Sequence, residues 1–313
     1  MMPKDREEPM GEFRRDLDAE DSLHVPHSAR VWNRFLGGKE CYDVDRSAAA
    51  DITDICPGMG AAVRQARGFL VRAVHHLAAQ EGVGQFLDVG CGLPMPEVFP
   101  RPYPDRIVHQ PSPHAPTPWP ATHDLHEVAR RAAPDARVLY VDNDPVVGAH
   151  AHALLTCGRD GVDFIDADLR DPGDILSQAR ELLDFSKPIA VVLGAVLGHL
   201  GVDPLDPHAA LTDPQQARPE TRAVVDALIA ALPRGSFLAA YDLDGGDPEA
   251  REAMLVFCDH GASPYLPLPR RLFGELFDGL EVLPPGVVRP EQWRPLREPD
   301  ADAPVWCAVG RKL

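Results

Sequence analysis

A short apolar segment and the turn after it hold the residues of this sequence whose types and spacing best suit ligand chemistry. Asp88 lies near the end of the segment, and Gly90 and Gly92 follow it at alternate positions. Residues 86–89 lack helical spacing and predict a buried strand. Glycine lets a backbone turn sharply and approach a ligand without a Cβ in the way. Because ligands of open α/β sheets bind beyond the carboxyl ends of the strands, we expect this turn, with Leu93 beside it, to contact a ligand.

Two classes of cofactor use a glycine turn of this kind. The dinucleotide fingerprint G-x-G-x-x-G requires a third glycine, but Met95 occupies that position. A carboxylate such as Asp88 repels a pyrophosphate and suits a cationic ligand, for example a sulfonium that carries an α-amino group. The pattern taken alone also fits a turn with a purely structural role.

A second acidic turn follows residues 137–141, which predict the next strand. Asp142, Asn143, Asp144 and Pro145 stand in sequence after it. An acidic residue at this strand end can accept both hydroxyls of a ribose, and Pro145 suits the first turn of a helix. Asp142 could instead cap that helix, but Asp144 can serve as the cap. We therefore favour Asp142 as the ribose ligand, with Asn143 beside it.

A third acidic residue follows the strand predicted at 162–167. Asp168 stands where a carboxylate can accept the amino group of an adenine, with Leu169 next to it. Asp171 precedes Pro172 and is expected to cap a helix.

The fourth predicted strand, 189–193, is fully apolar, as expected in a sheet that is covered on both faces. The residues after it are small, among them Ala195, and are expected to leave room for a ligand. His199 could act in this cleft as a base or as a polar contact. The alternative is that His199 is only structural.

The N-terminal region predicts a helical lid. Residues 26–36 are expected to form a helix that His27 or Ser28 caps and that Gly37 and Gly38 end. A second helix is expected to end near Pro57. Three polar residues between the helices are candidates to turn inward and to orient or deprotonate a substrate: Tyr42, Asp45 and Arg46. A solvated helix-loop-helix is the alternative.

The remaining segments alternate helix and strand, which indicates a parallel sheet. Nine prolines between residues 95 and 122 rule out helix or central strand, so 96–121 are predicted to be an inserted loop. Helices are expected at 60–80, from Asp124, at 213–232, 248–260 and 269–278. Strands are expected at 235–241, 280–283 and 304–309. The closing antiparallel pair brings the total to seven strands.

Composition limits the classes of partner. The 313 residues carry a net charge of -17, which disfavours nonspecific binding to nucleic acid or to an anionic membrane. No apolar run approaches the ~20 residues of a membrane span, and the charged N-terminus does not resemble a signal peptide. Six scattered cysteines without C-x-x-C favour a reduced, cytoplasmic setting and give no metal site. The sequence indicates no oligomeric state.

Several motifs together resemble the S-adenosyl methyltransferase family of high-GC Gram-positive bacteria, whose substrates are largely unassigned. The resemblance covers about residues 26–313. The most specific motif is the run from Tyr140 to Pro145. The other matching stretches are 29–39, 45–46, 85–94, 126–129, 168–172, 232–236 and 285–288.

This resemblance implies a Rossmann-like class I methyltransferase fold, with helices on both faces of the sheet. Residues 1–25 are charged and lack apolar periodicity, so they are expected to form a mobile arm, which a helical cap (26–80) and a cofactor-binding domain (81–313) follow. The resemblance also implies that S-adenosylmethionine donates a methyl group to an N, O or S atom of a small molecule. Asp88 and the glycine turn would hold the methionyl part, Asp142 the ribose, and Asp168 with Leu169 the adenine, while Ala195 and His199 line the cleft.

Two departures from the family pattern concern the site. Met95 replaces a threonine and the insertion follows it, and Gly198-His199 replaces a His-His or His-Phe pair. Two other functions stay open from the sequence: a nicotinamide-dependent oxidoreductase, and a non-catalytic protein that binds S-adenosylmethionine or S-adenosylhomocysteine.

Overall fold

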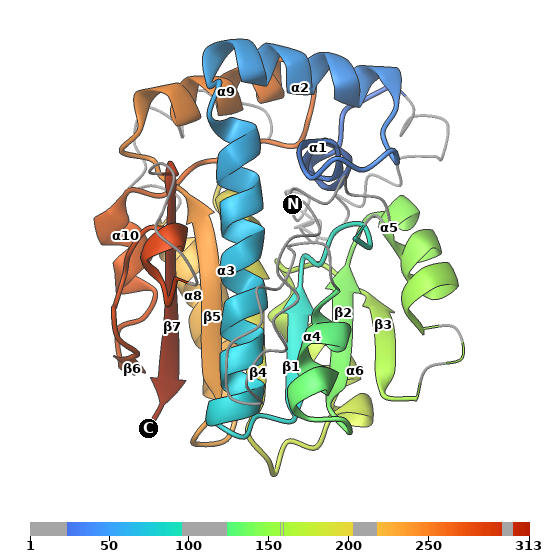
Figure 1. The fold of residues 1–313 in the computed structure, drawn as a ribbon, viewed down its shortest axis with the longest axis vertical. Helices are drawn as coiled ribbons and strands as arrows, with labels where there is room; N and C mark the ends of the chain where they lie inside the picture. Colours follow the sequence, from blue (N-terminus) through green and yellow to red (C-terminus); the bar gives the residue numbers. More distant parts are fainter. Residues whose placement is uncertain (1–23, 96–123, 157, 159, 203–217, 296–302) are drawn as a thin grey trace, which may run out of the picture.

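Seven strands form one sheet in the order β3-β2-β1-β4-β5-β7-β6 (Figure 1). The computed structural model describes residues 24–95, 124–156, 158, 160–202, 218–295 and 303–313. The strands are β1 (Gln85–Val89), β2 (Arg137–Asp142), β3 (Val162–Asp166), β4 (Ala190–Gly194), β5 (Phe237–Leu243), β6 (Leu280–Val282) and β7 (Val305–Lys312). β7 runs antiparallel to both of its neighbours, and the other pairs are parallel. The predicted fold class is confirmed.

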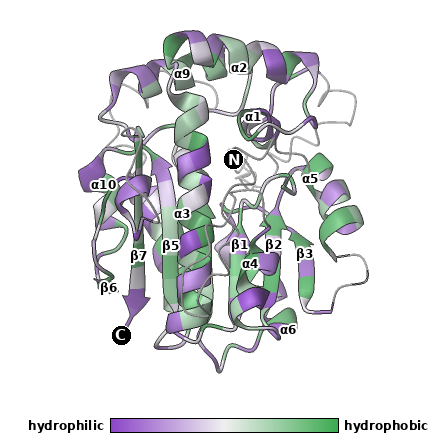
Figure 2. Ribbon diagram, in the orientation of Figure 1, coloured by the Kyte–Doolittle hydropathy of each residue, from purple (hydrophilic) through white to green (hydrophobic). Residues whose placement is uncertain are grey.

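Helices cover both faces of this sheet. One face packs against α3 (Met59–Gln80) and α4 (Leu125–Ala132), and the other packs against α6 (Pro172–Leu182), α8 (Arg218–Ala230) and α10 (Arg270–Glu275). The central strands are largely hydrophobic, whereas α3 mixes hydrophobic and hydrophilic residues (Figure 2). Strands covered on both faces need apolar side chains at every position, while a helix needs only one apolar stripe.

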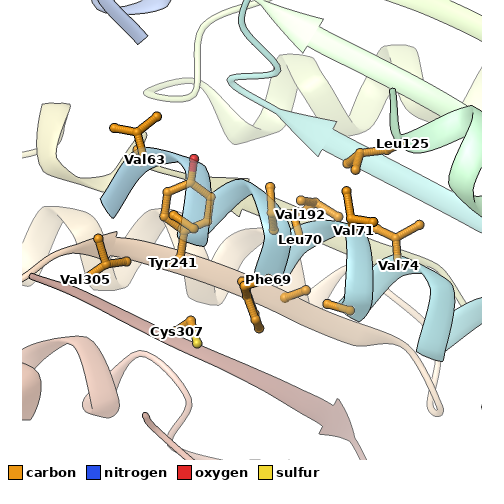
Figure 3. Packing of buried hydrophobic residues seen from close by; sticks show 14 of the residues in the cluster. Val63, Phe69, Leu70, Val71, Val74, Leu125, Val192, Tyr241, Val305 and Cys307 are labelled. Carbon is orange, nitrogen blue, oxygen red and sulfur yellow. The ribbon is translucent and has the colours of Figure 1, made fainter. Parts of the chain in front are cut away.

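The long helix α3 forms the core on its face of the sheet (Figure 3). Phe69 and Leu70 pack with Val192 of β4, Tyr241 of β5 and Cys307 of β7, and all five are buried. Spacing of three and four residues along α3 keeps its apolar side chains on this one stripe. The 3.6-residue periodicity in the sequence predicted this helix to within one residue.

Three helices lie across the carboxyl ends of the parallel strands: α1 (Ser28–Phe35), α2 (Asp43–Ile55) and α9 (Pro248–Asp259) (Figure 1). α2 packs along α9 and beside α1. The cap predicted at 26–80 is therefore divided in the structure. α1 and α2 lie over the carboxyl ends of the strands, whereas α3 belongs to the layer of helices on one face of the sheet.

The remaining elements agree closely with the predicted ranges. α5 (Pro145–His150) continues into a π-helix, Ala151–Thr156, that the sequence did not predict. The start of the helix predicted at 213–232 lies outside the described residues, as do residues 1–23 of the predicted arm and the predicted insertion at 96–121. Within the described ranges, no helix is long and apolar enough to cross a membrane.

Candidate active site

The turn after β1 adopts the left-handed conformation that its glycines were expected to allow. φ is 71° at Gly90 and 66° at Gly92. A Cβ on Gly90 would lie 2.5 Å from Cγ2 of Val196, so the space beside Gly90 is filled by protein rather than left for a ligand, which corrects our expectation. Among the residues that the structure describes, a Cβ on Gly92 would meet only Ala29, at 4.0 Å. The open approach therefore lies at Gly92, with the buried Leu93 beside it.

Asp142 lies at the end of β2 and holds this turn in place. The N–H of Gly92 donates to its Oδ2 at 2.9 Å, and the N–H of Asp144 donates to its Oδ1 at 3.1 Å. Burial raises the pKa of Asp142, although these two hydrogen bonds oppose the increase. Each carboxylate oxygen keeps a second lone pair, so Asp142 can accept one further hydrogen bond on each oxygen.

Asp144 caps α5, as expected, by accepting a hydrogen bond from the N–H of Val146 at 2.7 Å. Its other oxygen lies 2.9 Å from Nδ1 of His27, the residue directly before α1. Burial alone would raise the pKa of Asp144, but the contact with His27, the hydrogen bond from Val146 N and the charge of Arg30 together outweigh burial, and the pKa is lowered. No motif in the sequence predicted this link between α1 and the acidic turn after β2.

Asp88 is a buried carboxyl group next to the same turn. Burial raises its pKa to about 7, the positive charge of Arg67 opposes that increase, and the charges of Asp124 and Asp142 add to it. A carboxyl group held near neutrality gains most from a ligand that brings a positive charge. Asp88 therefore suits the cationic ligand that its position in the sequence predicted.

Asp168 and Asn143, both predicted to bind the adenosine part, lie together. The Asn143 side-chain amide donates to Oδ2 of Asp168 at 3.1 Å. Arg170 also binds both carboxylate oxygens of Asp168, with Nε at 3.0 and 3.1 Å. Burial would raise the pKa of Asp168, but the bonds from Arg170 outweigh it and the pKa is lowered. Asp171 caps α6, as predicted.

The small residues at the end of β4 and directly after it leave less room for a ligand than predicted. A Cβ on Gly194 would lie 2.8 Å from the ring of Tyr241, and a Cβ on Gly198 would lie 2.5 Å from the ring of Tyr265. These glycines therefore make space for two tyrosines rather than for a ligand. Ala195 has φ of 52°, a left-handed conformation that costs a non-glycine residue about 1–2 kcal/mol. Such strain is typical of functional sites.

His199 occupies the 3₁₀ turn Leu197–His199 after β4. Its Nδ1 lies 2.8 Å from the carbonyl oxygen of Pro264. A carbonyl oxygen only accepts, so Nδ1 carries the proton and Nε2 keeps a lone pair. Burial lowers the pKa of His199 to about 4, which keeps the ring neutral. Nε2 is buried and has no partner among the residues that the structure describes.

The three N-terminal candidates do not converge on a cleft. Asp45 is fully buried and accepts hydrogen bonds from Arg30 Nε at 2.8 Å, Tyr42 N at 2.8 Å and His27 N at 3.0 Å. Arg46 binds Asp43 and the carbonyl oxygen of Cys41 at the surface. Tyr42 is 39% exposed, and its ring lies under the guanidinium of Arg30. The expectation that Tyr42 and Arg46 turn inward is wrong, and Asp45 is committed to holding α1 against α2.

Two further residues near His199 were missed from the sequence. Asp242 is a fully buried residue of β5, and Tyr265 donates its hydroxyl to the Asp242 carboxylate. Neither residue belongs to a recognisable motif. Tyr265 lies far from His199 in the sequence, and the two residues come together only in the folded chain. Within the described ranges, no three acidic, histidine or cysteine side chains are placed to bind a metal ion.

The site therefore places acidic residues at the ends of β1, β2 and β3, beneath α1, with a neutral histidine after β4. A family described as S-adenosyl methyltransferase matches residues 13–100 and 115–313. The chain belongs to this family. The unmatched residues between these ranges fall inside the predicted insertion at 96–121. None of the curated proteins matches the chain.

Two solved structures resemble this S-adenosyl methyltransferase over nearly their whole length. A putative methyltransferase from Thermobifida fusca YX is 31% identical with a TM-score of 0.73, and the match covers 93% of this chain and 96% of that one. A DUF574 family protein from Streptomyces avermitilis MA-4680 is 29% identical with a TM-score of 0.73, and the match covers 93% and 99%. The protein is an S-adenosylmethionine-dependent methyltransferase, and the oxidoreductase alternative is set aside.

Proposed function

We propose that the cofactor lies across the carboxyl ends of β1, β2 and β3, and that the methyl acceptor is a small molecule with an N, O or S nucleophile. When bound, S-adenosylmethionine supplies a methyl group on a sulfonium that is already activated for transfer. The protein therefore has to bind, align and exclude water rather than activate the donor. The observation that carries this proposal is the hydrogen bond from Gly92 N to Asp142, which ties the two acidic turns into one cradle.

The residues present fit each part of the cofactor. Asp88, with its pKa near 7, would pair with the α-amino group. Gly92 presents an open backbone, and Asp142 keeps one lone pair on each oxygen for the two ribose hydroxyls. Asn143 and Leu169 would flank the adenine. Asp168 would reach the adenine amino group with an oxygen that Arg170 already binds, so Arg170 would share or leave that oxygen.

His199 is the residue we assign to the acceptor. Its Nε2 lone pair would accept a hydrogen bond from the N–H or O–H of the nucleophile. Efficient general bases have a pKa near the working pH, and a pKa of about 4 is too low for that role. We therefore assign His199 to orienting the acceptor rather than to removing its proton.

The chain's other properties support an acceptor of low molecular mass. The net charge of -17 opposes attraction to a polyanion. The five cysteines that the structure describes are free, in keeping with the reducing cytoplasmic setting that we propose.

Calorimetry on Asp142 variants tests the cofactor assignment. Asp142→Asn should weaken S-adenosylhomocysteine binding by roughly 10- to 100-fold, because a buried charged acceptor is worth about 1.5–3 kcal/mol. Asp166→Asn is the matched control, since Asp166 lies opposite Asp142 in the sheet register but is exposed. Unchanged affinity in Asp142→Asn would refute the ribose assignment.

NAD should not bind, and transfer of a radiolabelled methyl group to a metabolite extract would identify the acceptor.

A further inference from the structure

Asp242 is an acidic residue in the core for which cofactor binding gives no reason. It lies near the carboxyl end of β5 and is fully buried. Its Oδ1 accepts hydrogen bonds from the hydroxyl of Tyr265 and from the N–H of Leu243 at 2.7 Å. Its Oδ2 is buried and makes no hydrogen bond of ordinary geometry with the described residues, although the backbone N–H of Gly198 lies near enough to lower the pKa of the carboxyl group. Burying a carboxyl oxygen without a full hydrogen bond is costly, so this position calls for a functional explanation.

The partner of Asp242, Tyr265, is fixed on several sides. Its ring lies so close to Gly198 that any Cβ there would clash at 2.5 Å. It meets the His199 ring edge to face, with ring centres 4.9 Å apart and planes at 90°. It also lies 6.5 Å from the ring of Trp32 in α1. The hydrogen bond from the Tyr265 hydroxyl to Asp242 fixes the far end of the ring, so it restrains movement of the side chain in the plane of the ring.

The backbone next to Tyr265 is joined to the His199 turn by two more bonds. Leu266 N donates to the carbonyl oxygen of Gly198 at 2.7 Å, and Pro264 O accepts from Nδ1 of His199 at 2.8 Å. The proton position on His199 therefore depends on where the segment carrying Pro264 and Tyr265 lies. Asp242 of β5 anchors this segment, because its carboxyl group accepts the hydroxyl of Tyr265.

We propose that Asp242, acting through the Tyr265 hydroxyl, is a positioning residue that holds His199 with its Nε2 lone pair toward the methyl acceptor. This inference rests on the proposed role of His199 but not on the cofactor assignment. It explains why a buried carboxyl group and a tyrosine hydroxyl are paired beside the turn that carries His199. Burial raises the pKa of Asp242 to about 7, and the hydrogen bond from Tyr265 opposes that increase. Removal of this hydrogen bond should therefore raise the pKa of Asp242 further.

Nitrogen NMR of the full-length protein, labelled with 15N-histidine, tests the inference without a known acceptor. The His199 signal is assigned from its loss in His199→Gln. In the parent we expect a single tautomer, protonated on Nδ1. Tyr265→Phe removes only the hydroxyl, and Asp242→Asn removes the charge and replaces one acceptor oxygen by an N–H donor. Each variant should give a mixture of tautomers. The double variant should show no larger change than either single variant, because both act through one bond.

Tyr140→Phe is the matched control. The Tyr140 hydroxyl lies 3.0 Å from Nδ1 of His126 at a different place in the core, so this variant should shift the His126 signal and leave His199 unchanged. Affinity for S-adenosylhomocysteine should stay within about twofold of the parent in Tyr265→Phe and Asp242→Asn. If His199 keeps a single tautomer in both variants, or changes equally in Tyr140→Phe, the inference is overturned. Loss of S-adenosylhomocysteine binding by the parent would instead refute the cofactor site.

Discussion

At the scale of a single residue, the buried carboxyl group of Asp88 lowers the stability of the fold and is expected to strengthen binding of a cationic ligand. Its pKa in the folded protein is about 7, above the ordinary value of 3.8. Between these values the unfolded chain has lost the proton while the folded chain keeps it, so stability falls as pH rises from about 4 to 7. Above pH 7 the folded protein bears the full cost of a buried charge.

Asp88→Asn is therefore expected to raise stability and to lower affinity. At pH 8 the gain in unfolding free energy should be on the order of 2–4 kcal/mol, since each pKa unit corresponds to about 1.4 kcal/mol. The gain should shrink as the pH falls and vanish below about pH 3, where the parent carboxyl is protonated in both states. S-adenosylhomocysteine should bind roughly tenfold or more weakly, because its amino group loses a charged partner. Denaturant unfolding at pH 4.5 and 8, with calorimetry at pH 8, measures both effects. A variant that is less stable at pH 8 would contradict the assigned burial.

At the scale of elements, Asp45 decides whether α1 and α2 form a rigid cap. It is the buried partner of Arg30 and also accepts two backbone hydrogen bonds. Removing one member of a buried ion pair leaves an uncompensated charge and typically costs 3–5 kcal/mol. We expect about that loss in Asp45→Ala by denaturant unfolding. Asp43→Ala is the control on the same helix: Asp43 is 96% exposed in its pair with Arg46, so the loss should stay below about 1 kcal/mol.

The contact between α1 and the acidic turn predicts that the cofactor tightens the cap. His27 lies 2.9 Å from Asp144, whose own N–H binds the predicted ribose ligand Asp142. Trypsin should therefore cleave more slowly after Lys39, between α1 and α2, when S-adenosylhomocysteine is bound. His27→Ala should abolish that protection while Asp144 still caps α5. Equal cleavage with and without the ligand in the parent would count against a lid.

At the scale of the whole molecule, the sequence predicted the order and type of the elements well, because alternation of apolar strands with amphipathic helices is a local pattern. It also predicted which acidic residues lie at strand ends. It failed where the answer depends on which distant side chain fills a space. Gly90 and Gly198 were interpreted as room for a ligand, but Val196 and Tyr265 occupy that room. Asp45 was interpreted as a substrate contact because its partner Arg30 is recognisable only in the fold.

The predicted insertion at 96–121 gives the last test, because its two ends are already joined in the fold. Met95 N donates to Oδ1 of Asp124 at 3.0 Å, and Asp124 caps α4. Replacing 96–121 by a short Gly-Ser link should therefore leave the sheet intact. Shortening a loop about fourfold lowers its closure cost by only about 1 kcal/mol, so the melting temperature should stay constant or rise slightly.

The same replacement should alter affinity for S-adenosylhomocysteine, because the charge of Asp124 acts on Asp88 and the insertion begins beside Met95. A second variant that removes only 101–114, the residues outside the family match, separates the parts of the segment. If both shortened proteins fold and bind as the parent does, the insertion has no role at the cofactor mouth. If they fail to fold, the segment is structural and its ends are assigned wrongly. An intact fold with changed affinity in the longer deletion alone would place the functional residues next to Met95 and Asp124.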